Sequence, residues 1–159
     1  MDPEVKKKVL RWFTYGLHAV TAAAADETAM MTANFIAQSA FTPPHLMLAV
    51  EVDSKTHRVI EASRAFAVNV YDAGQRELAG QLGRHSAKQP QKAEGVVWRP
   101  GPETGSPILE GCLGWLECRV SGSLPSGDHT VYVAEVVEAG VNGEGAPLTM
   151  AESGFRHSG

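Results

Sequence analysis

Short apolar segments separated by turn signals run through most of this chain, and they constrain its fold more than any other feature. The strand-like segments cover residues 17–25, 29–39, 45–52, 65–71, 108–121 and 130–140. Several connections between them are short and rich in glycine, proline or aspartate, as in hairpins. The pattern predicts a mainly β fold with flanking helices, an antiparallel six-stranded barrel. A length of 159 residues suits one domain, so we assign residues 1–159 to it.

Three helices are expected beside the strands. Asp2 and Pro3 have the residue types of a helix start, Val5 and Val9 follow at helical spacing, and Gly16 is the expected end. Residues 55–63 form a second short helix, capped by Asp53 or Ser54, and residues 73–82 form a third.

Composition and charge exclude some classes of function. The net charge is −4 and the pI is about 5.8, which argues against a general nucleic-acid-binding protein. No apolar segment approaches the roughly 18–20 residues of a membrane span, so no membrane partner is expected. The first residues lack the apolar core of a signal peptide, and we therefore expect a cytoplasmic location.

Familiar catalytic and metal motifs are absent. The sequence has no glycine-rich phosphate loop, no serine hydrolase elbow and no HExxH, and its six histidines do not fall at metal-ligand spacing. No metal site is predicted. Cys112 and Cys118 lie in what reads as one extended strand, too far apart for a disulfide, so we expect buried free thiols.

The stretch AMMTANFIAQSAFTPPHLMLAV, residues 29–50, places hydrogen-bonding side chains inside an apolar segment. Thr32, Asn34, Gln38 and Ser39 lie beside small alanines, which let a flat ligand approach the backbone closely. The polar groups could then bind a heteroaromatic edge and a sugar-like chain. The alternative is an amphipathic strand with one solvated face, because Thr32, Asn34 and Gln38 share a parity.

Two further stretches carry possible binding groups. Ser54, Lys55 and Thr56 stand at a helix start, where free N–H groups and the helix dipole attract an anion such as a phosphate. Taken alone, the stretch is better explained by plain N-capping with a surface lysine. His129 directly precedes a strand at a tight turn, so it could face a cleft or lie on the surface.

Taken together, these stretches resemble the flavin reductase-like family of FMN-binding split barrels. The resemblance runs from about Gly16 to the end of the chain. It rests on a polar strand ending in Pro43-Pro44, on the segment IEASRAFAVNV, and on Gly-Asp-His before a strand at residues 127–129.

The resemblance implies a role for each matching position. Residues 30–39 would line the flavin, with Thr32, Ala33 and Asn34 along the isoalloxazine and Gln38 and Ser39 near the ribityl chain. Ser54, Lys55 and Thr56 would hold its phosphate, and His129 would serve the nicotinamide donor. The further cofactor-binding positions are Met31, Phe35, Arg84, His85, Phe155 and His157. His157 stands where the family usually has a tyrosine, so the sequence departs from the family's pattern in the C-terminal segment.

The expected function is hydride transfer from NAD(P)H to bound FMN and on to an acceptor, by a flavin reductase that acts as a homodimer. A partner monooxygenase is one possible acceptor. The first alternative is a one-component flavoprotein that reduces a quinone or an activated alkene, and the second is a non-catalytic FMN-binding electron carrier. A barrel without flavin is the remaining alternative. Because the cofactor carries the chemistry, the lack of a catalytic acid–base pair agrees with a flavin enzyme.

Overall fold

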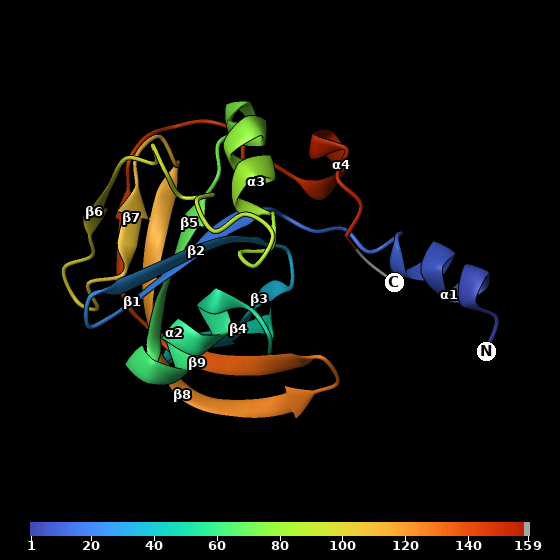
Figure 1. Ribbon diagram of the computed structural model, residues 1–159, viewed down its shortest axis with the longest axis horizontal. Coiled ribbons are helices and arrows are strands. Elements are labelled where there is room, and N and C mark those ends of the chain that lie inside the picture. The colour runs from blue at the N-terminus through green and yellow to red at the C-terminus, as the bar shows by residue number, and fades with distance from the viewer. Residues whose placement is uncertain (158–159) are drawn as a thin grey trace.

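The computed structural model describes residues 1–157, and β-strands dominate it (Figure 1). The strands are β1 (His18–Ala24), β2 (Glu27–Ala33), β3 (Ile36–Phe41), β4 (Pro44–Glu51), β5 (Ala65–Val70), β6 (Trp98–Pro100), β7 (Pro107–Leu109), β8 (Gly114–Ser126) and β9 (His129–Val141). The helices are α1 (Pro3–Leu10), α2 (Lys55–Ser63), α3 (Arg76–Leu82) and α4 (Met150–Ser153), with one 3-10 turn, η1 (Ala73–Gln75).

Seven strands form one antiparallel sheet in the order β2-β1-β5-β8-β9-β4-β3, and β6 and β7 form a separate pair. The predicted mainly β, antiparallel architecture with flanking helices is therefore confirmed. The prediction of six strands in a barrel needs correction, because the main sheet has seven strands and leaves β2 and β3 as its two edges.

The additional strand comes from a break inside the segment that the sequence presents as one strand, residues 29–39. At Asn34 the backbone makes a tight bend, in which the Ile36 N–H donates to the Asn34 carbonyl. The Asn34 side chain donates to the carbonyl of His157, 3.1 Å away, which fixes the bend. As a result β2 pairs with β1, whereas β3 pairs with β4 on the opposite edge of the sheet.

Two large apolar clusters, and a small third one around Ile108 and Trp115, lie within the described residues. The first lies within the curled sheet and includes Val20, Leu48, Phe66 and Tyr132, all of them fully buried. The second joins α3, the segment before α4 and the β1–β2 hairpin; among its members are Met30, Tyr71, Leu82 and Leu148. A cleft lies between elements that pack on these two clusters, with β4 and α2 on the first cluster and β2 and α3 on the second.

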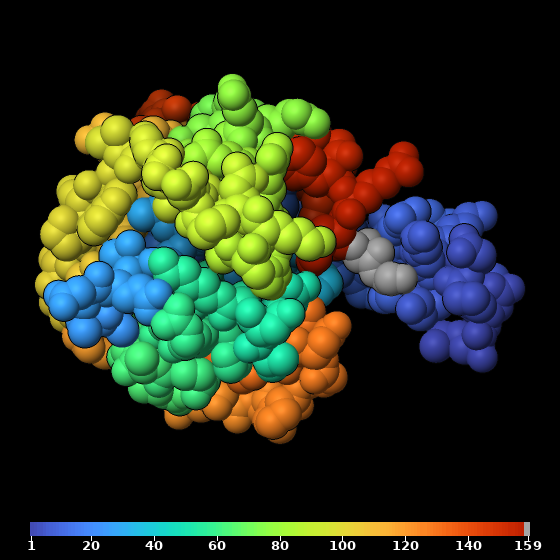
Figure 2. Space-filling model, viewed as in Figure 1, coloured from blue at the N-terminus to red at the C-terminus, as the bar shows by residue number. Residues whose placement is uncertain are grey.

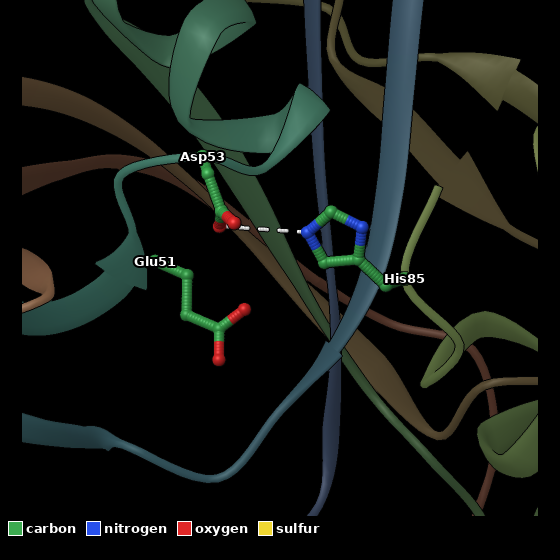
Figure 3. A group of neighbouring side chains, drawn as sticks. All are labelled: Glu51, Asp53 and His85. Carbon is green, nitrogen blue, oxygen red and sulfur yellow. Dashed lines mark ion pairs between the residues drawn. The ribbon is translucent and has the colours of Figure 1, made fainter. Parts of the chain in front are cut away.

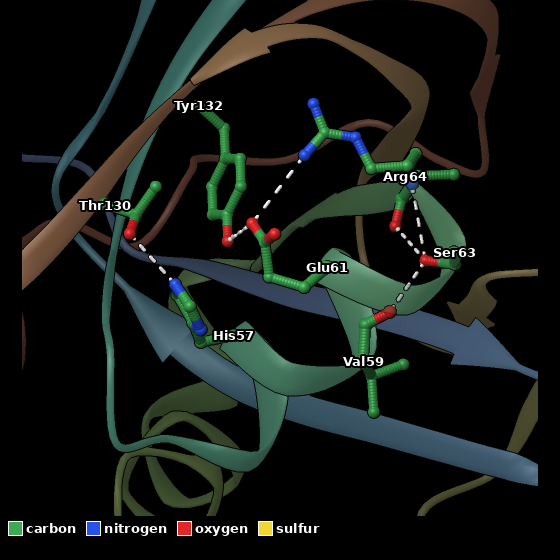
Figure 4. A network of polar contacts seen from close by, with 8 residues as sticks. His57, Val59, Glu61, Ser63, Arg64, Thr130 and Tyr132 are labelled. Atoms are coloured by element: carbon green, nitrogen blue, oxygen red, sulfur yellow. Dashed lines mark hydrogen bonds and ion pairs between the residues drawn. The ribbon is translucent and has the colours of Figure 1, made fainter. Parts of the chain in front are cut away.

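Polar contacts fasten α2 to the sheet (Figure 4). The buried Tyr132 hydroxyl donates to Glu61 Oε1 at 2.6 Å, and Arg64 lies 3.6 Å from the same oxygen. One helical turn earlier, His57 Nε2 lies 2.9 Å from the Thr130 hydroxyl. Helix α2 is thus tied to β9 along its length, which fixes the position of its N-terminus.

Helix α1 stands away from the body of the molecule (Figures 1 and 2). Asp2 caps it, as predicted, through its carboxylate and the N–H groups of Glu4 and Val5. The helix ends at Leu10 rather than near Gly16. Val5 and Val9 are exposed, and Trp12, just beyond the helix, has 68% of its surface exposed. The apolar spacing in this segment therefore forms a helix without burying it against its own domain.

Both cysteines are buried free thiols, as the sequence predicts. Cys118 lies in β8, whereas Cys112 lies in the turn before it, so the single extended strand expected for residues 108–121 is interrupted. Burial raises the pKa of Cys112 to about 11 and that of Cys118 to about 12, which keeps both protonated at neutral pH. Among the described residues, no helix has the length and apolar character needed to cross a membrane.

Candidate functional site

A cleft of about 550 Å³ opens where the end of β2, the end of β4 and the start of α2 meet. The turns after α3, the start of β9 and the C-terminal segment complete its walls. Eleven of the fifteen positions predicted for the site line it: Met31, Thr32, Ala33, Asn34, Phe35, Ser54, Thr56, Arg84, His85, His129 and His157. The fold therefore brings together residues separated by up to 126 positions in the sequence.

The β2 end of the cleft uses part of its polar capacity internally. The Thr32 hydroxyl donates to the Ala79 carbonyl at 2.7 Å, and Tyr71 donates to Thr32 Oγ1 at 2.9 Å. The Asn34 amide is occupied by the carbonyl of His157. The side chains of Thr32 and Asn34 therefore make hydrogen bonds within the protein. Their positions form neither a plain solvated face nor a set of free side-chain donors. Small Ala33 and the ring of Phe35 remain as a wall for a flat ligand.

Helix α2 presents its N-terminus to the cleft. Ser54 is the capping residue, since its hydroxyl accepts from the N–H of His57 at 3.1 Å. Thr56 is buried and lines the cleft. The first N–H groups of a helix have no partner within the helix, so this end can bind an anion. Lys55 instead lies 3.6 Å from Glu27 and lines a neighbouring groove with His85.

His129 faces the cleft rather than the outer surface, with 16% of its side chain exposed. Its ring lies 5.7 Å from that of Phe35, centroid to centroid. Nδ1 lies 2.6 Å from Asp128 Oδ1, and this contact lowers the pKa of Asp128. The paired carboxylate orients the imidazole and leaves Nε2 available to a ligand.

The turns after α3 supply the cations of the cleft. Arg84 and Lys88 are exposed at its rim, whereas Lys92 is buried and donates to the carbonyls of Leu82 and Arg84 at 2.8 and 2.7 Å. Burial lowers the pKa of Lys92 to about 8. Nothing in the sequence distinguishes Lys92 from the other polar residues of this segment, because its burial depends on carbonyls brought together by the fold.

Some predicted positions lie elsewhere. Gln38 and Ser39 are exposed on β3, outside the lining of the cleft, and the Gln38 amide donates to the Ala40 carbonyl. Phe155 lies in an adjoining pocket of about 320 Å³ that shares Asn34 and His157 with the cleft. Their roles in flavin binding stay predictions.

Glu51 and Asp53 are not among the predicted site residues, but they also line the cleft. The sequence feature that could have indicated them is their alternation with Ala49 at, and just beyond, the end of an apolar strand.

The antiparallel sheet thus carries a cleft lined by a helix N-terminus, an apolar wall and an oriented histidine, an arrangement that could bind a flat ligand with an anionic group. Comparison with known proteins gives the family. Residues 10–159 match the model of the flavin reductase like domain. The chain therefore belongs to the flavin reductase-like family, as its motifs predict.

Similar proteins agree with this assignment. The reductase subunit HsaB of a flavin-dependent monooxygenase from Mycobacterium tuberculosis is 32% identical over 86% of this chain and 71% of its own length. An NADH-dependent flavin reductase from Rhodococcus is 31% identical over 98% of this chain and 89% of its own length.

Among solved structures, an NADH:FAD oxidoreductase of Streptomyces globisporus in complex with NAD and FAD fragments superposes with a TM-score of 0.84. It is 29% identical and covers 99% of this chain and 94% of its own. The comparisons confirm the predicted class of enzyme, an NAD(P)H-dependent flavin reductase.

Proposed function

We propose that this protein is an NAD(P)H:flavin oxidoreductase that uses FMN and supplies reduced flavin to a partner monooxygenase. One observation carries the proposal, namely that a helix N-terminus, a small-residue wall and an oriented histidine line the same cleft. The name of the mycobacterial relative, a reductase subunit of a flavin-dependent monooxygenase, supports the partner. The split barrel stays part of the proposal.

The residues of the cleft suit FMN. The N-terminus of α2, with Ser54 and Thr56, would hold a terminal phosphate, and Arg84 and Lys88 add positive charge on the facing wall. Ala33 and Phe35 would lie against the ring system, where the small side chain permits close approach. A short anion site of this kind supports FMN over the longer FAD, although a relative is named an FAD reductase.

A flavin held in this cleft would supply the redox chemistry, as the acceptor of a hydride from the nicotinamide nucleotide. The protein has to bind and orient both ring systems and exclude water from between them. His129, held by Asp128, presents Nε2 to the cleft and would position the nicotinamide nucleotide. Backbone N–H groups of the β2–β3 bend would stabilise negative charge on the reduced ring without any nucleophile.

We also propose a cytoplasmic homodimer. Several large apolar side chains are exposed in one subunit, among them Trp12 at 68%, Phe13 at 60% and Phe41 at 88%. Side chains of this kind are enriched in protein interfaces. Met30, by contrast, is buried in the core, and Phe35 lies in the cleft.

The proposal is tested by following NADH and NADPH oxidation while the FMN concentration is varied. A reductase with exchangeable flavin shows saturation in FMN and oxidises far more nicotinamide than there is protein. A rate that depends only on flavin already bound supports a one-component flavoprotein. Failure of both nucleotides to react with any flavin overturns the proposed activity and leaves an electron carrier.

The phosphate site has a test of its own. Replacing Thr56 with alanine should weaken binding of FMN more than binding of riboflavin, because only FMN carries the phosphate. Lys55→Ala is the matched control, and it should have the smaller effect because Lys55 faces Glu27 outside the cleft. Equal losses for FMN and riboflavin in Thr56→Ala contradict the assignment.

A further inference from the structure

Lys92 is a buried, charged side chain in the wall of the cleft, and it takes no part in the binding roles proposed for the other lining residues. It is 7% exposed, and its Nζ donates to the carbonyls of Leu82 and Arg84 at 2.8 and 2.7 Å. Burial, together with the charge of Lys55 on α2, lowers the pKa of Lys92 to about 8. The fold therefore disfavours the charged form of this lysine, and groups of this kind cluster at functional sites.

The contacts of Lys92 close residues 83–91 into a loop at the edge of the cleft. Leu82 is the last residue of α3, so its carbonyl has no partner within the helix, and a cation is favourable at this end. The carbonyl of Lys92 in turn accepts from Gln81 Nε2 at 2.7 Å. The ammonium group and the backbone of Lys92 thus fasten the two ends of the loop to the end of α3.

This loop carries two of the predicted site residues. Arg84 lines the cleft, and its Nη1 donates to Gln89 Oε1 within the loop at 2.9 Å. His85 points toward the facing wall, where its Nε2 lies 3.5 Å from Asp53 Oδ1 (Figure 3). Because Lys92 binds the carbonyl of Arg84, it sets the direction in which the chain leaves α3. The positions of the Arg84 and His85 side chains follow from that direction.

We propose that Lys92 is a positioning residue for the flavin: its ammonium group holds the loop so that Arg84 faces the phosphate of FMN, and tight binding of FMN depends on the Lys92 proton. The inference rests on the proposed flavin reductase function and adds a control of FMN affinity by pH. Backbone carbonyls use two of the three N–H groups of Lys92. Lys92 therefore acts on the phosphate through Arg84.

The direction of the pH effect follows from the hydrogen bonds to the two carbonyls. Protonated Lys92 makes charge-assisted hydrogen bonds, whereas the neutral amine makes weaker ones and carries no charge. The protonated form is lost as the pH rises through about 8. The affinity for FMN should therefore fall with rising pH, by at most about tenfold between pH 7 and pH 9. By the same linkage, binding of FMN at pH 8 should take up protons from the buffer.

Other charged and titratable groups stand around the same cleft, so variants of Lys92 decide which group is responsible for a pH profile. They are Lys55 on α2, Glu51 and Asp53 at and just beyond the end of β4, His129 on β9, His157 in the C-terminal segment, and Arg84, His85 and Lys88 in the loop. Lys92→Met removes the Lys92 proton and leaves all of these in place.

The test measures the Kd for FMN and for riboflavin from pH 7 to pH 9. The parent should lose affinity for FMN across this range, whereas riboflavin, which lacks the phosphate, should change little. Lys92→Met should bind FMN at pH 7 about as weakly as the parent does at pH 9, with no dependence on pH. Lys92→Arg, whose guanidinium group stays protonated, should bind FMN independently of pH. Lys8→Met, which removes an exposed lysine of α1, is the matched control and should keep the parental profile.

A double variant shows whether Lys92 acts through Arg84. If it does, Arg84→Met alone loses most of the pH dependence, and Lys92→Met/Arg84→Met binds FMN no more weakly than Arg84→Met. Additive losses of FMN affinity indicate a direct contact between Lys92 and the phosphate, and they overturn the positioning role.

Three further results overturn the proposal. They are a parental Kd for FMN that is constant from pH 7 to pH 9, a pH dependence that persists in Lys92→Met, and equal losses for FMN and riboflavin in Lys92→Met. If Lys92→Met does not fold, the parental profile, the proton uptake and the flat profile of Lys92→Arg decide. If the parent protein binds no flavin at any pH, the proposed function fails first, which distinguishes the two failures.

Discussion

Replacing Thr32 with valine removes one hydroxyl group and almost no volume, and it separates a structural role from a flavin-binding role. The Thr32 hydroxyl donates to the Ala79 carbonyl, so the hydroxyl of the buried Tyr71 is the donor in their 2.9 Å contact. In the variant this Tyr71 donor loses its acceptor. The Ala79 carbonyl retains the N–H of Gly83 at 3.0 Å.

An unsatisfied buried hydroxyl costs about 1–3 kcal/mol, and the Ala79 carbonyl adds little because it keeps its helical partner. A loss of about 2 kcal/mol lowers the Tm of a chain of this length by roughly 4–8 °C. Thermal unfolding of the parent, Thr32→Val and Thr32→Ser measures this directly. Thr32→Ser keeps the hydroxyl and should recover most of the loss.

The same variants show whether Thr32 also binds flavin. If its hydroxyl is fully used by Ala79 and Tyr71, Thr32→Val should bind FMN with nearly the affinity of the parent. The double variant Thr32→Val/Tyr71→Phe should regain stability relative to Thr32→Val, because neither partner is then left unpaired. A Tm equal to that of the parent, or a large loss of FMN affinity at unchanged stability, refutes the structural reading.

Three further predictions concern single side chains. His129→Ala should slow flavin reduction by NADH in stopped-flow measurements and leave the Kd for FMN unchanged; equal rates would return His129 to a surface role. The buried Glu117 carboxylate accepts hydrogen bonds from Thr104 N, Thr104 Oγ1 and Glu103 N at 2.6–3.1 Å. In Glu117→Gln the amide would turn a donor toward one of these donors. The substitution should therefore lower the free energy of unfolding by about 2–3 kcal/mol. Lys92 has a pKa of about 8 in the fold against 10.5 unfolded, so the unfolded state binds more protons between these values. The free energy of unfolding of the parent minus that of Lys92→Met should therefore rise with pH across that window, by up to about 3 kcal/mol. If denaturant unfolding shows that this difference does not change with pH, Lys92 titrates normally.

Much of the architecture follows from local patterns in the sequence. The hairpin of residues 18–33, the helix capped by Ser54 and the strand of residues 65–70 appear where apolar spacing, turn residues and caps predict them. The split of residues 29–39 into two strands has no local signal in the sequence, since the bend lies at Asn34, whose side chain contacts the carbonyl of His157. That contact joins positions 123 residues apart.

The site shows the same division. Residue chemistry and family resemblance together select positions such as Thr56 and His129, which the fold does bring into one cleft. They do not select Glu51 and Asp53, which lie beside His85 in the cleft, or Lys92, whose burial depends on the carbonyls of Leu82 and Arg84. Conversely, Thr32 looks available in the sequence, and only the structure reveals the buried partners that occupy its hydroxyl.

The most direct test of the central claim is the visible spectrum of the FMN-loaded protein during anaerobic addition of NADH or NADPH. The proposed function predicts that the absorption of oxidised flavin bleaches with one equivalent of nucleotide and returns on admission of air. A protein that takes up no FMN, or whose bound FMN stays oxidised with both nucleotides, contradicts it.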